Sequence, residues 1–153
     1  MRSELEIKLE PVKKKIEVRL NQESAFRLFT DEIGKWWPLA QYSVGQELAE
    51  TCCLEGKLGG RIYEVKQDGS ESEWGNVTVW EPFEKVGFDW YPGRTPETAQ
   101  AVTITFTEFQ GGTLVALVQT GWEILGEKAE TNRDGYDKGW DIVLAQYIGA
   151  TGE

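Results

Sequence analysis

One apolar stripe near the end of the chain constrains the fold more than any other feature. Its members recur at intervals of three and four residues, which is typical of one face of an amphipathic α-helix. They are Tyr136, Trp140, Val143, Leu144, Tyr147 and Ile148. The residues from Thr51 to Trp122 read almost entirely as β-strand. A long helix after a block of antiparallel strands needs a sheet to cover its apolar face, so we expect one sheet packed against one final helix.

The first third of the chain predicts a strand followed by a helix. Ile16, Val18 and Leu20 alternate with polar residues, as in a half-buried strand. Asn21 is a suitable N-cap for the next element. The apolar positions of that helix have helical spacing and are Ala25, Phe26, Phe29 and Ile33.

The middle of the chain predicts antiparallel strands joined by tight turns. Asp68-Gly69, Pro92-Gly93 and Gly111-Gly112 are turn signals. The strands that they separate are expected over residues 61–65, 74–80, 86–90, 102–106 and 114–118.

The final helix is expected to begin near Glu127, soon after Gly126. Gly135 and Gly139 then lie inside it, each at a cost of about 1 kcal/mol relative to alanine. A close approach of the helix to the sheet would offset that cost. The alternative is a helix that begins only after Gly135. We expect residues 1–153 to form one domain, with the polar residues before Pro11 frayed.

The charge balance argues against polyanionic partners. Asp and Glu number 26 against 16 Lys and Arg, a formal net charge of −10. Nucleic acid and anionic membranes are repelled on average by such a chain. The only basic run, Lys13-Lys14-Lys15, is interpreted as a solvated or edge-strand cluster that discourages further strand pairing.

The residue types that are missing exclude several kinds of site. The chain has no histidine, which removes Ser-His and Cys-His nucleophile pairs and the usual zinc sites. We expect no metal and no cofactor. Cys52 and Cys53 are adjacent and point to opposite faces of a strand, so reduced thiols are expected. No apolar stretch is long enough to span a membrane and no signal peptide is visible, so a cytoplasmic protein is expected.

Several short motifs occur in a fixed order between Lys14 and Ile148. They are Ala25-Phe26 with Trp36-Trp37, Gly59-Gly60-Arg61-Ile62-Tyr63-Glu64, Trp74-Gly75-Asn76-Val77, Trp80-Glu81-Pro82, Gly121-Trp122, and Tyr136 with Gly139-Trp140. This order resembles the START/SRPBCC superfamily, which shares the helix-grip fold of the birch-pollen allergen. Within it the chain is most similar to the bacterial branch named for the activator of the heat-shock-protein-90 ATPase.

The resemblance implies an α+β fold of β-α-α-β6-α order, with a curved antiparallel sheet wrapped around the C-terminal helix. It implies a cavity between them that in some relatives binds lipids, sterols, polyketides or other apolar molecules. Other relatives are cyclases or aromatases, and the namesake of the branch is a co-chaperone. Relatives often carry a histidine where this chain has Gln119, so a role that needs a titrating imidazole there is in doubt.

An aromatic-rich set of residues is predicted to contact a ligand. A mostly apolar pocket with a few polar groups is the usual form of a small-molecule site. The alternative is that these side chains simply fill the core. The set is Trp37, Tyr63, Val77, Phe88, Trp90, Phe106, Leu117, Gln119, Arg133, Tyr136, Trp140 and Leu144.

Arg133 lies on the apolar stripe by helical phase. A guanidinium there needs a partner, because an unpaired buried charge is costly. One interpretation is a salt bridge to Glu64, Asp89 or Glu123, or a side chain that extends to the rim. The other is an anchor for an anionic group on the ligand.

Candidates for catalysis are fewer. Glu64 and Asp89 could act as a general base, and Tyr63 could donate to an oxyanion. Tyr63 and Glu64 are adjacent, so strand alternation sends them to opposite faces unless a bulge intervenes.

Three functions remain open from the sequence. The first is non-catalytic binding of a small, largely apolar molecule, with or without an anionic group. The second is a cyclase or hydrolase that uses the same cavity. The third is a protein-interaction module, such as a chaperone partner. Either a monomer or a homodimer fits the composition.

Overall fold

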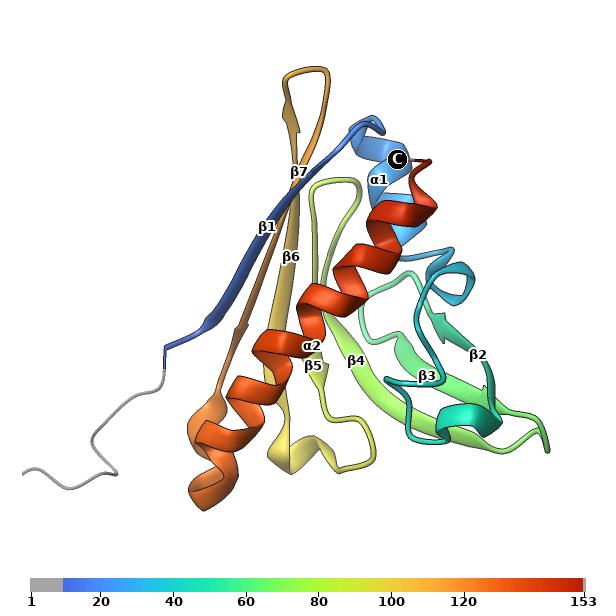
Figure 1. Cartoon of the computed structure of the whole chain (residues 1–153), viewed down its shortest axis with the longest axis vertical. Helices are drawn as coiled ribbons and strands as arrows, with labels where there is room; N and C mark the ends of the chain where they lie inside the picture. The colour runs from blue at the N-terminus through green and yellow to red at the C-terminus, as the bar shows by residue number, and fades with distance from the viewer. Residues whose placement is uncertain (1–9, 153) are drawn as a thin grey trace, which may run out of the picture.

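A single curved sheet of seven antiparallel strands forms the framework of the described structure (Figure 1). The structure is a computed structural model and describes residues 10–152; the expected fraying before Pro11 therefore falls almost wholly outside the described residues. The strand order is β1-β7-β6-β5-β4-β3-β2. The strands are β1 (Val12–Val18), β2 (Ala49–Leu54), β3 (Arg61–Lys66), β4 (Glu71–Glu81), β5 (Lys85–Trp90), β6 (Gln100–Phe109) and β7 (Gly112–Thr120).

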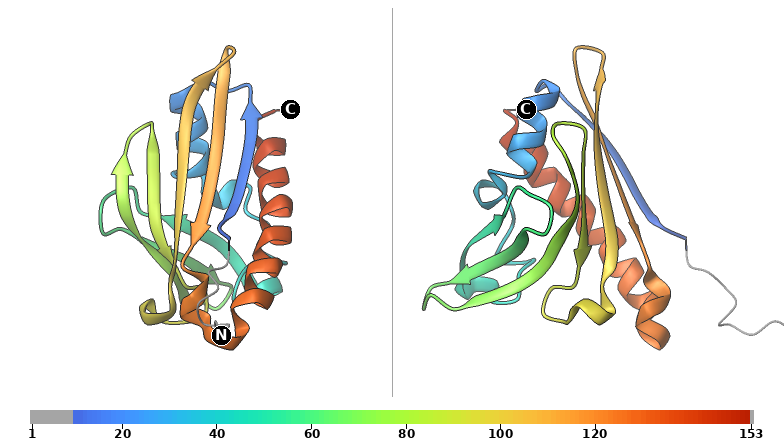
Figure 2. Two further views of the ribbon diagram at one scale, coloured as in Figure 1. Left: turned by 90° about the vertical axis from the view of Figure 1, so that its left-hand side faces the viewer. Right: turned by 180° about the vertical axis from the view of Figure 1, so that it is seen from behind.

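Two α-helices lie on one face of this sheet. Figures 1 and 2 show the long helix α2 (Ala129–Ala150) crossing the concave face, with its C-terminal end beside α1 (Gln22–Phe29). The Tyr147 hydroxyl of α2 donates to the Ala25 carbonyl of α1 at 2.8 Å, which joins the two helices. This arrangement confirms the predicted helix-grip fold. Within residues 10–152, no helix is long and apolar enough to cross a membrane.

Most boundaries of the helices agree with the sequence prediction. Asn21 caps α1, because its side chain accepts a hydrogen bond from the Ser24 backbone N–H at 2.8 Å. The helix α2 begins at Ala129, directly after a 3-10 segment, η5 (Trp122–Lys128). The alternative of a helix that begins only after Gly135 is therefore wrong.

The second helix of the expected β-α-α-β6-α order is reduced to short 3-10 turns. They are η2 (Ile33–Lys35) and η3 (Gln46–Leu48); a third turn, η4 (Pro96–Thr98), lies between β5 and β6. Gly34 packs so closely on β2 that an added Cβ would lie 2.7 Å from the Cys52 carbonyl oxygen. Pro38 follows soon after and disfavours helical continuation. The chain between α1 and β2 is consequently a loop, and this loop later forms one side of the candidate site.

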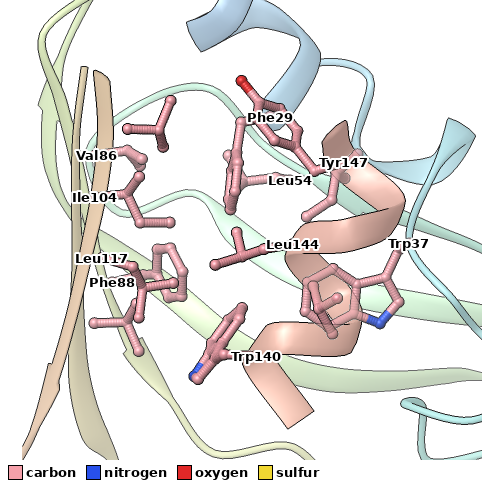
Figure 3. Packing of buried hydrophobic residues seen from close by; sticks show 14 of the residues in the cluster. Phe29, Trp37, Leu54, Val86, Phe88, Ile104, Leu117, Trp140, Leu144 and Tyr147 are labelled. Carbon is pink, nitrogen blue, oxygen red and sulfur yellow. The ribbon is translucent and has the colours of Figure 1, made fainter. Parts of the chain in front are cut away.

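The second half of α2 packs directly against the rest of the core. Leu144 and Tyr147 point toward the sheet and α1, as Figure 3 shows. Tyr147 contacts the rings of Phe29 and Trp36, with both pairs of centroids 5.2 Å apart. Phe106 from β6 meets Phe29 from the other side, at 6.1 Å. Side chains fill the space between helix and sheet at this end.

The first half of α2 is held to the edge of the sheet by an ionic contact. Lys14 on the edge strand β1 lies 3.0 Å from both the Asp137 and Asp141 carboxylates. Burial acts to lower the pKa of Lys14, but these two carboxylates outweigh it and the pKa is raised. The lysine run is thus the edge-strand cluster expected from the sequence, and its middle member also positions α2.

The two cysteines lie on opposite faces of β2, as predicted. Cys52 is buried and Cys53 is half-buried, and neither forms a disulfide. Burial raises the pKa of the Cys52 thiol to about 12, with smaller contributions from Cys53 and Glu64. At neutral pH the Cys52 thiol is therefore protonated and a poor nucleophile.

This difference predicts selective alkylation of the folded protein by iodoacetamide at pH 8. The Cys53→Ser variant, which retains only Cys52, should react at least about tenfold more slowly than Cys52→Ser, because thiolate is the reactive form. Intact-mass spectrometry over time measures both rates. Equal rates in folded protein would contradict the burial of Cys52, and urea should abolish the difference.

Candidate ligand-binding cleft

A cleft with a volume of about 550 Å³ opens beside the first half of α2. This volume is within the usual range for small-molecule sites. One side is the loop between η2 and η3, the second is the end of β5 with the turn after it, and the third is α2. The residues that line it are Trp37, Gln41, Tyr42, Ser43, Val44, Trp90, Pro92, Gly93, Thr131, Asn132, Gly135, Tyr136, Gly139, Trp140 and Val143.

Three indole rings form the inner wall of the cleft. Trp37 from the loop, Trp90 from β5 and Trp140 from α2 contact one another, with centroids 5.8 to 6.1 Å apart. These are ordinary distances for tilted and edge-to-face aromatic pairs. The rings come from three separate segments, so only the folded chain assembles this wall. Figure 3 shows Trp37 and Trp140 on the same side of the core cluster, beside α2.

Hydrogen bonds within the loop hold the side of the cleft that the loop forms. The Trp37 indole N–H donates to the Tyr42 carbonyl at 2.7 Å, and the Ser43 hydroxyl donates to the Leu39 carbonyl at 2.6 Å. Backbone bonds from Gln41 and Tyr42 to the Pro38 carbonyl complete the turn. Local hydrogen bonds therefore fix the shape of the loop.

A buried carboxylate fixes where this loop sits. Glu64 on β3 is fully buried and accepts three hydrogen bonds. The donors are the backbone N–H groups of Val44 and Gly45, at 2.6 and 2.7 Å, and the Trp74 indole N–H at 2.6 Å. Hydrogen bonds to a charged acceptor are stronger than neutral ones. Glu64 thus ties the lining residue Val44 and its neighbour Gly45 to the sheet.

Two glycines shape the helical side. A Cβ on Gly139 would lie 3.2 Å from the Tyr42 ring, so glycine permits the close approach of α2 to the loop. A Cβ on Gly135 would meet nothing within 4 Å, because that position faces the open cleft. The helix therefore tolerates both glycines for different reasons. The close approach expected from the sequence is to the loop rather than to the sheet.

The Arg94 guanidinium lies beside Tyr136, which lines the cleft. Burial raises the pKa of Tyr136, while the Arg94 guanidinium and the Trp90 indole N–H act in the opposite direction. Arg94 donates to the Gln100 side-chain oxygen at 2.8 Å and to the Thr98 carbonyl, which are neutral acceptors. Among residues 10–152, Arg94 forms no salt bridge with a carboxylate.

The structure brings together four of the residues expected to contact a ligand. Trp37, Trp90, Tyr136 and Trp140 line the cleft. Gln119 lies directly behind Trp140, whose indole N–H donates to its side-chain oxygen at 2.6 Å. Five others are buried in the core instead: Val77, Phe88, Phe106, Leu117 and Leu144. The hollow expected between helix and sheet is thus found only beside α2 up to Val143, because aromatic rings pack around Tyr147 beyond it.

Arg133 does not line the cleft. Its guanidinium donates to the backbone carbonyls of Glu10 and Pro11 and lies 3.5 Å from the Asp134 carboxylate. None of the expected salt-bridge partners is involved, because these carbonyls at the start of β1 lie closer to its position on α2. The cation beside the cleft is Arg94, which the sequence reasoning missed.

The catalytic candidates do not converge in the cleft. Glu64 is occupied by its three N–H donors. Tyr63 follows strand alternation and lies on the other face, where the Arg61 guanidinium carbon is 4.1 Å from its ring centroid. Asp89 lies on the face of β5 opposite the buried Phe88 and Trp90. Within residues 10–152 there is also no group of three or more metal-ligating side chains.

Sequence reasoning also missed the loop residues Gln41 to Val44 and the turn Pro92-Gly93. No periodic pattern marks a loop, so hydropathy offered no signal there. The helix glycine Gly139 was the one indication that another segment approaches α2 at this point.

Comparison with protein families gives a match over residues 19–149. The family is described as "Activator of Hsp90 ATPase homolog 1-like protein". The chain belongs to this family. No curated protein sequence gives a significant match.

Several solved structures share the fold of this chain. Protein BH1534 from Bacillus halodurans has a TM-score of 0.68 at 20% identity, covering 95% of this chain and 99% of its own. The Aha1 dimer from Colwellia psychrerythraea has a TM-score of 0.67 at 16% identity, covering 94% and 96%. An anthrahydroquino-gamma-pyrone synthase, Txn09, complexed with SUM has a TM-score of 0.59 at 25% identity, covering 85% and 88%.

The role of Glu64 can be tested by replacing its charge. Glu64→Gln should lower the free energy of unfolding by about 2–4 kcal/mol, because one N–H then faces an amide N–H₂ instead of an oxygen. Urea unfolding gives that energy. Hydrogen exchange should show faster exchange at Val44 and Gly45.

Glu71→Gln is the matched control, since Glu71 pairs with Arg61 in an exposed position. That change should cost less than about 1 kcal/mol. Similar losses in the two variants would contradict the anchoring role of Glu64.

Proposed function

We propose that this protein binds a small, largely apolar molecule in the cleft beside α2, without transforming it. One observation carries the proposal: a cleft of about 550 Å³ is walled by aromatic rings that three separate segments contribute. Its indole faces offer apolar area, while its few polar groups could set the orientation of a ligand.

The chemistry of the lining supports an apolar and neutral ligand core. No described residue that lines the cleft is a carboxylate, an amine or a thiol. The carboxylates considered for catalysis lie elsewhere, with Glu64 engaged by N–H donors and Asp89 on the outer face of β5. Binding without reaction is therefore the function that this arrangement supports best.

Catalysis in the same cleft is the second candidate, and one observation favours it. The synthase Txn09 resembles this chain at 25% identity over 85% of this chain's length. The hydroxyl groups of Ser43, Thr131 and Tyr136 line the cleft and would be the first groups to examine. Conversion of a bound molecule into a product of different mass would replace the first proposal with this one.

We also propose classes of protein partner and a cellular compartment for this chain. The family description and the dimeric Aha1 neighbour make a chaperone partner and a homodimer reasonable candidates. The two unpaired cysteines fit a reducing compartment such as the cytoplasm. Analytical ultracentrifugation of the purified chain distinguishes a monomer from a homodimer.

Native mass spectrometry of protein purified from its own host tests the main proposal directly. A bound species that is released on unfolding is the expected result. Thermal shift with a panel of apolar compounds should then show stabilisation by related molecules. A protein that neither carries nor binds any of them would contradict the proposal.

Filling the cleft from α2 should block binding. Gly135→Leu places a side chain where a Cβ has open space, so we expect at least about a tenfold loss of affinity in isothermal titration calorimetry. Gly149→Leu is the control, because Gly149 is also helical and open but does not line the cleft. Both variants should be more stable than wild type by up to about 1 kcal/mol, since glycine is a poor helix former. Equal affinities for the two variants would place the ligand elsewhere.

A further inference from the structure

Among residues 10–152, no helix or strand covers the outer face of the central strands β5, β6 and β7. Both α-helices lie on the opposite, concave face of the sheet (Figures 1 and 2). On β6, the buried Val102, Ile104 and Phe106 face the helices. Successive side chains of a strand point to opposite faces, so the threonines between these residues point outward. The sheet therefore has a second face that the rest of the described chain leaves open.

The strand register arranges the outward side chains of five neighbouring strands, β1, β7, β6, β5 and β4, in rows. One row consists of Lys15, Ala116, Thr105, Lys85 and Glu81. The next row consists of Lys13, Val118, Thr103, Gly87 and Val79. The outward side chains of the two middle strands, β7 and β6, are all uncharged in these rows. A neutral centre between charged sides is the usual layout of a protein–protein interface.

The charges on this face are balanced, whereas the whole chain has a formal net charge of −10. On the β1 side the outward charges are Lys13, Lys15 and Glu17, one more cation than anion. On the β5 and β4 side they are Lys85, Asp89 and Glu81, one more anion than cation. Two copies of an acidic chain repel each other on average. This face escapes that repulsion, and its two sides carry opposite net charge.

Such a pattern is complementary to itself about β6, the middle strand of the five. A symmetric dimer uses the same surface of both copies, related by a two-fold axis. If the axis runs along β6 between two facing sheets, β1 of each copy lies over β4 of the other. Lys15 of each copy then faces Glu81 of the other, and the two Thr105 side chains meet at the axis. Facing sheets with closely aligned strands are a common packing mode.

Building on the homodimer considered under the proposed function, we propose that this outer face of the five strands binds a second copy of the chain. Five strands and four rows cover about 20 Å by 20 Å, roughly 400 Å² per copy. That is about half the area of a standard interface, so we expect a weak dimer with a dissociation constant of about 10–100 μM. The ligand cleft lies on the concave side and stays open in this dimer.

A charge-swap series tests the position of the axis. Sedimentation velocity from about 1 to 500 μM brackets the expected dissociation constant of the wild-type dimer. Lys15→Glu and Glu81→Lys should each weaken the dimer at least about tenfold, because each places like charges opposite each other twice. The double variant Lys15→Glu/Glu81→Lys restores both pairs and should dimerise within about threefold of wild type. Urea unfolding confirms that each variant still folds.

Lys138→Glu is the control for net charge, because it makes the same change as Lys15→Glu at an exposed position on α2. It should leave dimerisation within about threefold of wild type. Val118→Asp places a carboxylate in the neutral centre and should abolish the dimer. Ile142→Asp is its matched control, since Ile142 is an apolar side chain of α2 that is 42% exposed.

Two results would overturn this interface while leaving a homodimer in place. One is a double variant that dimerises no better than the single variants, and the other is a dimer that Ile142→Asp disrupts as strongly as Val118→Asp. A wild-type chain that stays monomeric at every concentration would overturn the interface and the homodimer together. Ligand binding in the cleft is measured separately and stands or falls on its own results.

Discussion

The apolar face of α2 can leave water only if the antiparallel sheet bends around it. The two halves of the helix meet this requirement differently. Around Tyr147, aromatic rings of Phe29 and Trp36 pack directly against the helix, and Phe106 from β6 contacts Phe29. Around Trp140, the loop between η2 and η3 also packs against α2. Its close approach is possible because Gly139 has no side chain. Burial of the same apolar helix face therefore gives a compact core at one end of α2 and a cleft at the other.

The position of the loop depends on a buried charge. Glu64 has no cationic partner among its hydrogen-bond donors, so three N–H groups must stabilise its carboxylate. An unpaired buried charge is costly, and the three N–H donors offset that cost. Here the Glu64 carboxylate fixes Val44 and Gly45. It thereby positions the loop side of the cleft, which belongs to no α-helix or strand. The rigidity of the site thus comes from β3, although its lining comes from the loop.

The lining of the cleft is neutral, although the chain as a whole is acidic. The molecule carries a formal net charge of −10, yet no described residue that lines the cleft is charged. Local geometry, rather than net charge, decides what such a site can hold. The fold alone does not decide it either, since structural neighbours at 16–25% identity include a synthase and a dimer named for Aha1.

The sequence by itself determined the elements, because each depends on local spacing. The stripe on α2, the Asn21 cap and the turns at Gly69, Gly93 and Gly111 could all be predicted, as could four aromatic members of the cleft. It could not show that Phe106 and Leu144 fill the core while Trp90 borders a cleft, since all are apolar residues on inward faces. Nor could it place Arg133 and Arg94, or the loop from Gln41 to Val44. Those choices depend on distances between segments far apart in the chain, which only tertiary packing sets.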